Sequence, residues 1–154
     1  MGQSLKGGKM DKLTKEAQYH GEIFESLTFF RKSLAALSGE KSESCLKDLN
    51  IFFDEHIVEH FQFEEKEIFD IIIKSATPEE KHLIRTFQEE HIQLLDKIDR
   101  FKDLFVQCEV KPEKNKLEEL LKLSKDIVET MLAHARKEDT ELFPLLRKYH
   151  LDIE

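Results

Sequence analysis

The sequence predicts an all-α protein, an up-down-up-down antiparallel bundle of four helices. Apolar residues recur at spacings of three and four through four long segments, which is the period of a helix that buries one face. The alternation of apolar and polar residues that is typical of strands is absent. Only five glycines and three prolines interrupt the 154 residues, so the connections are short and favour antiparallel neighbours.

The first helix is expected at about residues 10–38, because Gly39 then suits a C-terminal cap. Residues 1–9 hold three of the glycines and are predicted to form a flexible N-terminal tail ahead of a single domain at 10–150. The apolar side of this helix includes an imidazole, in the series Leu13, Ala17, His20, Phe24, Leu27 and Leu34.

The second helix is expected at about residues 43–76, with Ser42 as a possible N-terminal cap. Two polar residues one turn apart, His60 and Glu64, lie in the middle of its apolar stripe. The rest of the stripe is Leu46, Leu49, Phe53, Ile57 and Ile71.

The third helix should run over about residues 78–109. Its start combines a capping Thr77, a proline at the first helical position and Glu80 three residues after the cap. His91 falls in the apolar stripe, whereas His82 lies about 180° away and should face water. The stripe consists of Ile84, Phe87, His91, Leu94, Ile98, Phe101 and Phe105.

The fourth helix is expected at about residues 112–148, because the residue before Pro112 resists helical geometry and separates it from the third. Its inward arc again holds a histidine and a carboxylate one turn apart, His134 and Glu138. They are accompanied there by Ser124, Ile127, Met131, Ala135, Leu142 and Leu145.

The four inward histidines are predicted to meet at one level of the bundle. His20 lies about 18 residues before the end of its helix and His60 about 17 after the start of the next, which antiparallel packing makes level within a turn. The same comparison places His91 and His134 at that level within about 6 Å. A single core histidine is more often a hydrogen-bonded structural residue, but four in one layer favour a metal site in the core of the bundle.

The ligand types narrow the choice of metal. Imidazole and carboxylate without thiolate suit iron, manganese or zinc, and argue against iron–sulfur clusters and copper(I). A histidine and a carboxylate four residues apart point to the same side of a helix, so each such pair can present two ligands to one or two ions.

Two segments, residues 60–69 and 134–144, resemble the paired H-x-x-x-E-E-x-x-[LI]-F segments of hemerythrin-like (HHE) cation-binding domains. His20 and His91 fall where that family places its other ligands, and the resemblance covers most of the chain. It implies a non-haem centre of two iron ions, bridged by Glu64 and by an acidic residue after His134. An open position on one iron would then receive dioxygen, nitric oxide or peroxide.

The sequence departs from the oxygen-carrying members in the third helix. They have a second histidine one turn before the third-helix ligand, where this chain has Phe87. One iron therefore lacks an expected imidazole, and His56, Glu67 or a solvent ligand are candidates to replace it. A site with one protein ligand fewer should exchange ligands more readily, which favours sensing or reaction with peroxide over stable oxygen carriage.

The acidic bridge of the fourth helix has two candidates. In the oxygen carriers it lies five residues after the histidine, which matches Asp139. The helical wheel instead puts Glu138 nearer the inward stripe, so it favours Glu138, and both residues remain candidates.

Cys45 and Cys108 are expected near one end of the bundle, where a redox-linked disulfide is conceivable.

Composition excludes some partners. The chain has 24 Lys and Arg against 32 Asp and Glu, a net charge of -8, so binding to nucleic acid is not expected. No apolar run is long enough to span a bilayer, and the N-terminus lacks the apolar core of a secretory signal. We therefore expect a cytoplasmic protein that does not bind membranes.

Three functions follow from these predictions. The first is a protein that binds or senses dioxygen, nitric oxide or the iron and redox state, and passes its signal to an unidentified protein partner. The alternative is an enzyme that reduces peroxide or oxidises ferrous iron. The third is a structural or interaction bundle without a functional metal, whose exposed face binds another protein.

Overall fold

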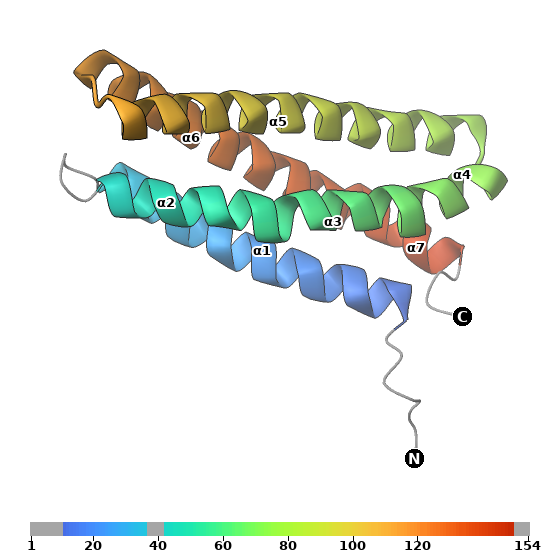
Figure 1. Cartoon of the computed structure of the whole chain (residues 1–154). Helices are drawn as coiled ribbons and strands as arrows, with labels where there is room; N and C mark the ends of the chain where they lie inside the picture. The colour runs from blue at the N-terminus through green and yellow to red at the C-terminus, as the bar shows by residue number, and fades with distance from the viewer. Residues whose placement is uncertain (1–10, 37–41, 150–154) are drawn as a thin grey trace.

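The computed structural model describes residues 11–36 and 42–149, and these form four long helical rods without any strand among them (Figure 1). The first rod is α1, Lys12–Ala35, and the third is α5, Pro78–Val110. The all-helical prediction is therefore confirmed for this part of the chain.

The second and fourth rods are continuous helices that contain short π-helical turns, in which each hydrogen bond spans one residue more than in an α-helix. The second rod consists of α2 (Ser42–Phe52), η2 (Phe53–Ile57), α3 (Val58–Phe63), η3 (Glu64–Phe69) and α4 (Asp70–Ser75). The fourth consists of α6 (Lys114–Lys137), η4 (Glu138–Leu142) and α7 (Phe143–Lys148).

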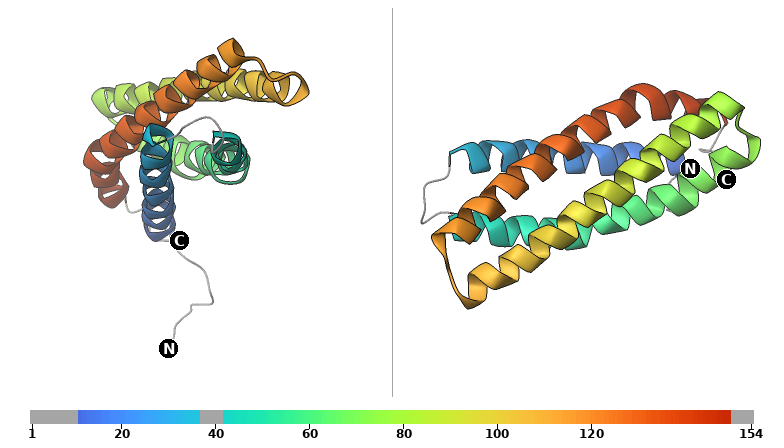
Figure 2. Two further views of the ribbon diagram at one scale, coloured as in Figure 1. Left: turned by 90° about the vertical axis from the view of Figure 1, so that its left-hand side faces the viewer. Right: turned by 90° about the horizontal axis from the view of Figure 1, so that it is seen from above.

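Each rod packs against two others, so that the four enclose one elongated core. Helix α1 contacts α2 and α6, while α5 contacts α4 and α6. Figure 2 shows the arrangement of the four rods from one end and from above. None of the helices in residues 11–36 and 42–149 is both long and apolar enough to cross a bilayer.

The helix starts follow from local sequence. Thr77 and Glu80 form the predicted capping box, and Pro78 is the first residue of α5. Asp11 caps α1 by accepting a hydrogen bond from the backbone N–H of Thr14 at 2.7 Å. The predicted cap at Ser42 is wrong, because α2 already includes this residue.

Two predictions lie outside the described residues, namely the N-terminal tail at 1–9 and the helix cap at Gly39.

The two cysteine thiols lie within the described residues. Cys45 and Cys108 are both free, and each packs half-buried against the apolar core. Burial raises the pKa of both thiols.

The core consists of two apolar clusters. The larger includes Leu27, Phe53, Phe101 and Ile127, and the smaller includes Phe87. Fully or nearly fully buried polar residues lie between the two clusters along every rod, so the bundle has a polar layer inside its core. These residues are Glu16, His20, His60, Glu64, His91, His134 and Glu138.

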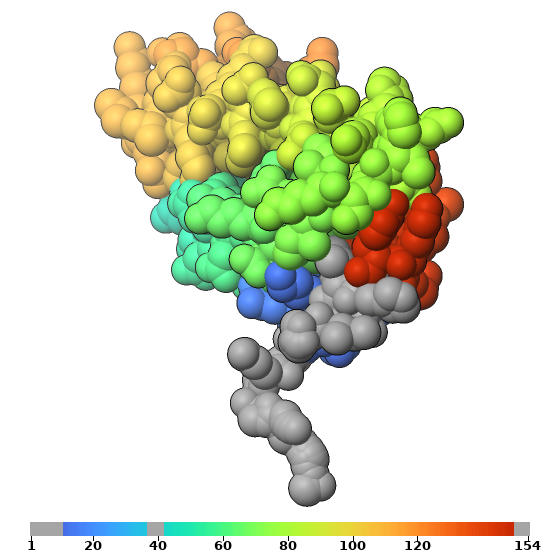
Figure 3. Space-filling view, turned by 90° about the vertical axis from the view of Figure 1, so that its right-hand side faces the viewer, coloured from blue at the N-terminus to red at the C-terminus, as the bar shows by residue number. Residues whose placement is uncertain are grey.

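Glu80 joins the start of α5 to the end of α7 at one end of the bundle. Figure 3 views this end, where the red residues of α7 lie beside the green part of the chain. The Glu80 carboxylate accepts hydrogen bonds from Lys148 Nζ at 2.6 Å, from the Tyr149 hydroxyl and from the Thr77 backbone N–H at 2.9 Å. Lys148 first, then Tyr149 and Thr77, lower the pKa of Glu80 to about 2.

We expect Glu80→Gln to melt at a lower temperature than the wild type near neutral pH. Because the folded-state pKa of Glu80 is depressed, its contribution is present above the usual glutamate pKa of 4.5 and is lost as pH falls toward about 2. The melting temperatures of the wild type and Glu80→Gln should therefore approach each other toward the acidic end of this range. Glu79→Gln, at an exposed neighbour, is the control, and melting curves of wild type and Glu80→Gln that coincide at neutral pH would contradict the prediction.

Candidate metal centre

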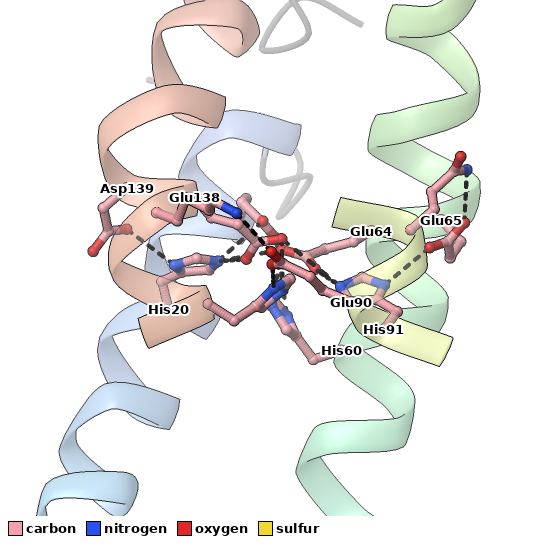
Figure 4. Close-up of polar contacts among 12 residues, drawn as sticks. His20, His60, Glu64, Glu65, Glu90, His91, Glu138 and Asp139 are labelled. Atoms are coloured by element: carbon pink, nitrogen blue, oxygen red, sulfur yellow. Dashed lines mark hydrogen bonds and ion pairs between the residues drawn. The ribbon is translucent and has the colours of Figure 1, made fainter. Parts of the chain in front are cut away.

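The polar layer brings one histidine from each rod to a common point, as predicted. His20 comes from α1, His60 from α3, His91 from α5 and His134 from α6. All four side chains are buried. Figure 4 shows Glu64 and Glu138 reaching into the space between these rods.

The two carboxylate oxygens of Glu64 point toward different histidines of this layer. Its Oε2 lies 3.2 Å from His20 Nε2 and 3.1 Å from His60 Nε2. Its Oε1 lies 2.9 Å from His91 Nε2. One carboxylate therefore spans the distance between two groups of imidazoles.

Glu138 is placed in the same way. Its Oε1 lies 2.9 Å from His20 Nε2, and its Oε2 lies 3.1 Å from His134 Nε2 and 3.8 Å from His91 Nε2. Potential ligand atoms within 4.8 Å of one another thus fall into two groups that share Glu64 and Glu138. The first group also contains Glu16, His20 and His60, and the second also contains His91 and His134.

The donor set fits metal cations because several inward atoms have no hydrogen-bond partner. Glu64 Oε1, His91 Nε2, His134 Nε2 and Glu138 Oε2 are all buried and unpaired, although they approach one another closely. Buried polar atoms normally find a partner, and their loss of hydration is costly when they do not. Atoms that converge without hydrogen bonding are those that a shared cation would hold.

The buried histidines and carboxylates of the site lie close enough together to shift one another's pKa. Burial lowers the pKa of the imidazoles, but the neighbouring carboxylates outweigh it and raise the pKa of His91 to about 11 and of His134 to about 9. Burial likewise raises the pKa of Glu64 and Glu138, yet the adjacent histidines bring both below the usual value. A cation entering the layer would displace protons from the imidazoles.

Three of the histidines are oriented from behind by a second carboxylate. Nδ1 of His20 lies 3.0 Å from Asp139, that of His91 lies 2.9 Å from Glu65, and that of His134 lies 2.7 Å from Glu90. Such outer carboxylates fix the ring orientation and the tautomer of a metal-binding imidazole, so that Nε2 faces the metal. Figure 4 shows the contacts of His20 with Asp139 and of His91 with Glu65 as dashed lines on the outer side of the rings.

Glu90→Ala should weaken metal binding without abolishing it. Glu90 accepts hydrogen bonds from His134 Nδ1 and from Lys137 Nζ at 2.6 Å, so its loss frees the His134 ring to turn. We expect metal affinity to fall by about 10–100-fold, the usual cost of losing an outer partner. Competition with a coloured chelator measures it, with exposed Glu89→Ala as control; unchanged affinity in Glu90→Ala would contradict this role.

Two proposed replacements for the missing imidazole are not brought to the cluster. His56 lies in the π-helical turn η2, where it is exposed and packs beside the Phe52 ring. Glu67 is about half exposed and pairs with Lys12 Nζ at 3.2 Å. At the position where the oxygen carriers have their second histidine, Phe87 is fully buried, and its ring lies beside that of His134.

The structure separates the two candidates for the acidic bridge. Glu138 is buried at the centre of the layer, whereas the Asp139 side chain is 45% exposed and contacts the outer nitrogen of His20. The wheel therefore placed Glu138 correctly. Asp139 lies where it can orient a ligand rather than join the two groups.

Sequence reasoning missed Glu16. It is completely buried in α1, and its Oε2 lies 3.3 Å from His20 Nε2. The signal was available, because Glu16 stands one turn before His20, the same spacing that joins His60 to Glu64 and His134 to Glu138.

The two carboxylates that both groups share, Glu64 and Glu138, have a common local backbone feature. Glu64 is the first residue of η3 and Glu138 the first of η4, each four residues after an inward histidine. π-helical turns within α-helices occur frequently at functional sites, because the additional residue changes the direction of the side chains around it. The second and fourth rods thus present these two carboxylates from the same kind of helical turn.

Comparison with known proteins agrees with this geometry. The family model described as the hemerythrin HHE cation binding domain matches residues 11–146, which include the whole polar layer. No curated protein and no solved structure gives a match. The chain therefore belongs to the family of hemerythrin HHE cation-binding domains.

Proposed function

We propose that this protein binds two iron ions and uses them to bind or sense dioxygen, nitric oxide or the iron and redox state. In this proposal His20 and His60 hold one ion, His91 and His134 hold the other, and Glu64 bridges them. Glu138 is the second bridge. The observation that carries the proposal is that each of these two carboxylates turns one oxygen toward each histidine pair.

The surrounding residues give this centre its properties. Two irons held there would supply an electron-rich site for small oxygen- or nitrogen-containing ligands. Phe61, from the larger apolar cluster, stacks on His91 with ring centroids 3.9 Å apart, and Phe69 and Phe87, from the smaller cluster, pack beside His91 and His134. This apolar wall keeps bulk water from the layer and limits entry to small molecules.

The metal content of the purified protein tests the proposal. Protein prepared without air should contain about two iron ions per chain and should gain an oxo-bridged absorption band on exposure to air. Manganese and zinc suit the same donors and are counted in the same measurement. Protein without bound metal would refute the proposal, while turnover of hydrogen peroxide or ferrous iron would make it an enzyme.

Alanine substitutions distinguish the roles of the two neighbouring acids. Glu138→Ala should lose bound iron, because it removes a bridge between the two groups. Asp139→Ala should keep both ions and lose about 10–100-fold in affinity, because Asp139 touches only the outer nitrogen of His20. Iron counting after gel filtration measures both, and the reverse order of effects would make Asp139 the bridge.

We also propose that the rods run up-down-up-down within one domain at about residues 10–150. Connections of two residues between α4 and α5, and three between α5 and α6, support this order because such short links join antiparallel neighbours.

A further inference from the structure

The two halves of the polar layer are unequal in donors. The half around His20 and His60 has a further carboxylate, Glu16, whereas the half around His91 and His134 has none besides the shared Glu64 and Glu138. The first half can therefore offer five protein donors to a cation and the second only four.

Glu16 has the properties of a ligand rather than of a surface acid. Its side chain is completely buried, and neither carboxylate oxygen has a hydrogen-bond partner. Oε2 lies 3.3 Å from His20 Nε2, and Oε1 lies 3.9 Å from His60 Nδ1. A buried carboxylate without a hydrogen bond is costly unless a cation is held beside it.

A regularity along the chain explains why the second half is short of one donor. Three inward histidines have a carboxylate one turn away on the same face, in the pairs Glu16–His20, His60–Glu64 and His134–Glu138. The fourth, His91, has Phe87 at the corresponding position. Phe87 is completely buried, and its ring centroid lies 5.9 Å from that of His134.

Surface grooves also reach the second half. One groove, between α3, η3 and α5, is lined by Phe61, Glu65 and His91 among others. Another, between α5 and α6, is lined by Glu90 and His134 among others. Neither groove includes Glu16, His20 or His60.

We propose that Glu16 is a terminal ligand of the ion held by His20 and His60, so that the exchangeable coordination position belongs to the ion held by His91 and His134, next to Phe87. This inference rests on the proposed two-metal function. It assigns a different role to each half: the first retains its ion, and the second receives the small ligand.

Azide binding to the iron-loaded, oxidised protein tests the position of the exchangeable site. Phe87→His adds an imidazole one turn before His91, where it can fill the open position. We expect azide to bind at least about tenfold more weakly than to the wild type, as measured by visible absorbance, while the iron content stays unchanged. Phe87→Leu removes the ring without adding a ligand and should keep azide affinity close to that of the wild type, which separates packing from coordination.

Glu16→Gln tests the ligand itself. Gln keeps the shape of the side chain but removes the charge, so we expect one of the two irons to bind at least about tenfold more weakly. Glu67→Gln is the matched control, since this half-exposed glutamate lies outside the polar layer and pairs with Lys12. Circular dichroism and the melting temperature show whether each variant is folded.

The outcomes separate this inference from the function on which it rests. Wild-type protein that binds no pair of metals would remove the proposed function itself. Wild-type protein with two irons, combined with unchanged iron affinity in Glu16→Gln or unchanged azide binding in Phe87→His, would overturn only the assignment of the open position.

Discussion

Glu64→Gln should remove both metal ions, not one. Glu64 lies within 3.2 Å of His20 and His60 through Oε2 and within 2.9 Å of His91 through Oε1, so both groups of ligands depend on it. An amide has no negative charge, and one of its two ends is a hydrogen-bond donor that repels a cation. Leaving buried charges without their partner costs about 3–5 kcal/mol, which corresponds to more than a hundredfold in affinity.

Elemental analysis of the desalted variant measures this effect. Iron should fall from about two ions per chain to a trace, because both ions lose a charged ligand that they share. Glu67→Gln, one turn further along the same rod and about half exposed, should retain the wild-type content. A Glu64→Gln protein that still holds one full equivalent of iron would show that the two groups bind independently and that Glu64 is not shared.

Metal loading should raise the melting temperature of the protein by about 10 °C. The folded chain gathers seven buried ionisable side chains at one level, and the unfolded chain has no such site. A ligand at a thousand times its Kd stabilises the folded state by about 4 kcal/mol. For a domain of this size each kcal/mol corresponds to about 2–4 °C.

Calorimetry without air compares the metal-free protein with the same protein plus ferrous iron, and a chelator should reverse the shift. Glu64→Gln should show little or no change on addition of iron, which distinguishes binding at the centre from weak binding at acidic surface residues. Equal melting temperatures for the metal-free and loaded wild type would mean that the polar layer does not hold the metal.

Local rules explain what could be predicted from the sequence. The capping box at Thr77 and Glu80 depends on residues three apart, and it is present in the structure. The inward faces of the helices follow from their period, which correctly placed His20, His60, His91 and His134 in the core and His82 on the surface.

The errors arose where the backbone leaves the ideal period or where side-chain reach matters. His56 was expected near the stripe, but it lies in a π-helical turn and is exposed. Glu16 was overlooked because an acidic residue near a helix start reads as solvent-exposed until a neighbouring rod covers it. Glu65 and Glu90 lie at the rim of the core, and only the packed helices show that they reach the outer nitrogens of His91 and His134.

The amino-acid sequence alone determined the number of helices, the buried faces and the level at which the imidazoles meet, since periodicity, caps and rise per residue are properties of a single helix. Tertiary structure decided that Glu16 also faces inward, which carboxylates orient a ring from behind, and which half of the layer has one donor fewer. Those distinctions depend on distances of about 3 Å between different rods, and no single helix contains that information.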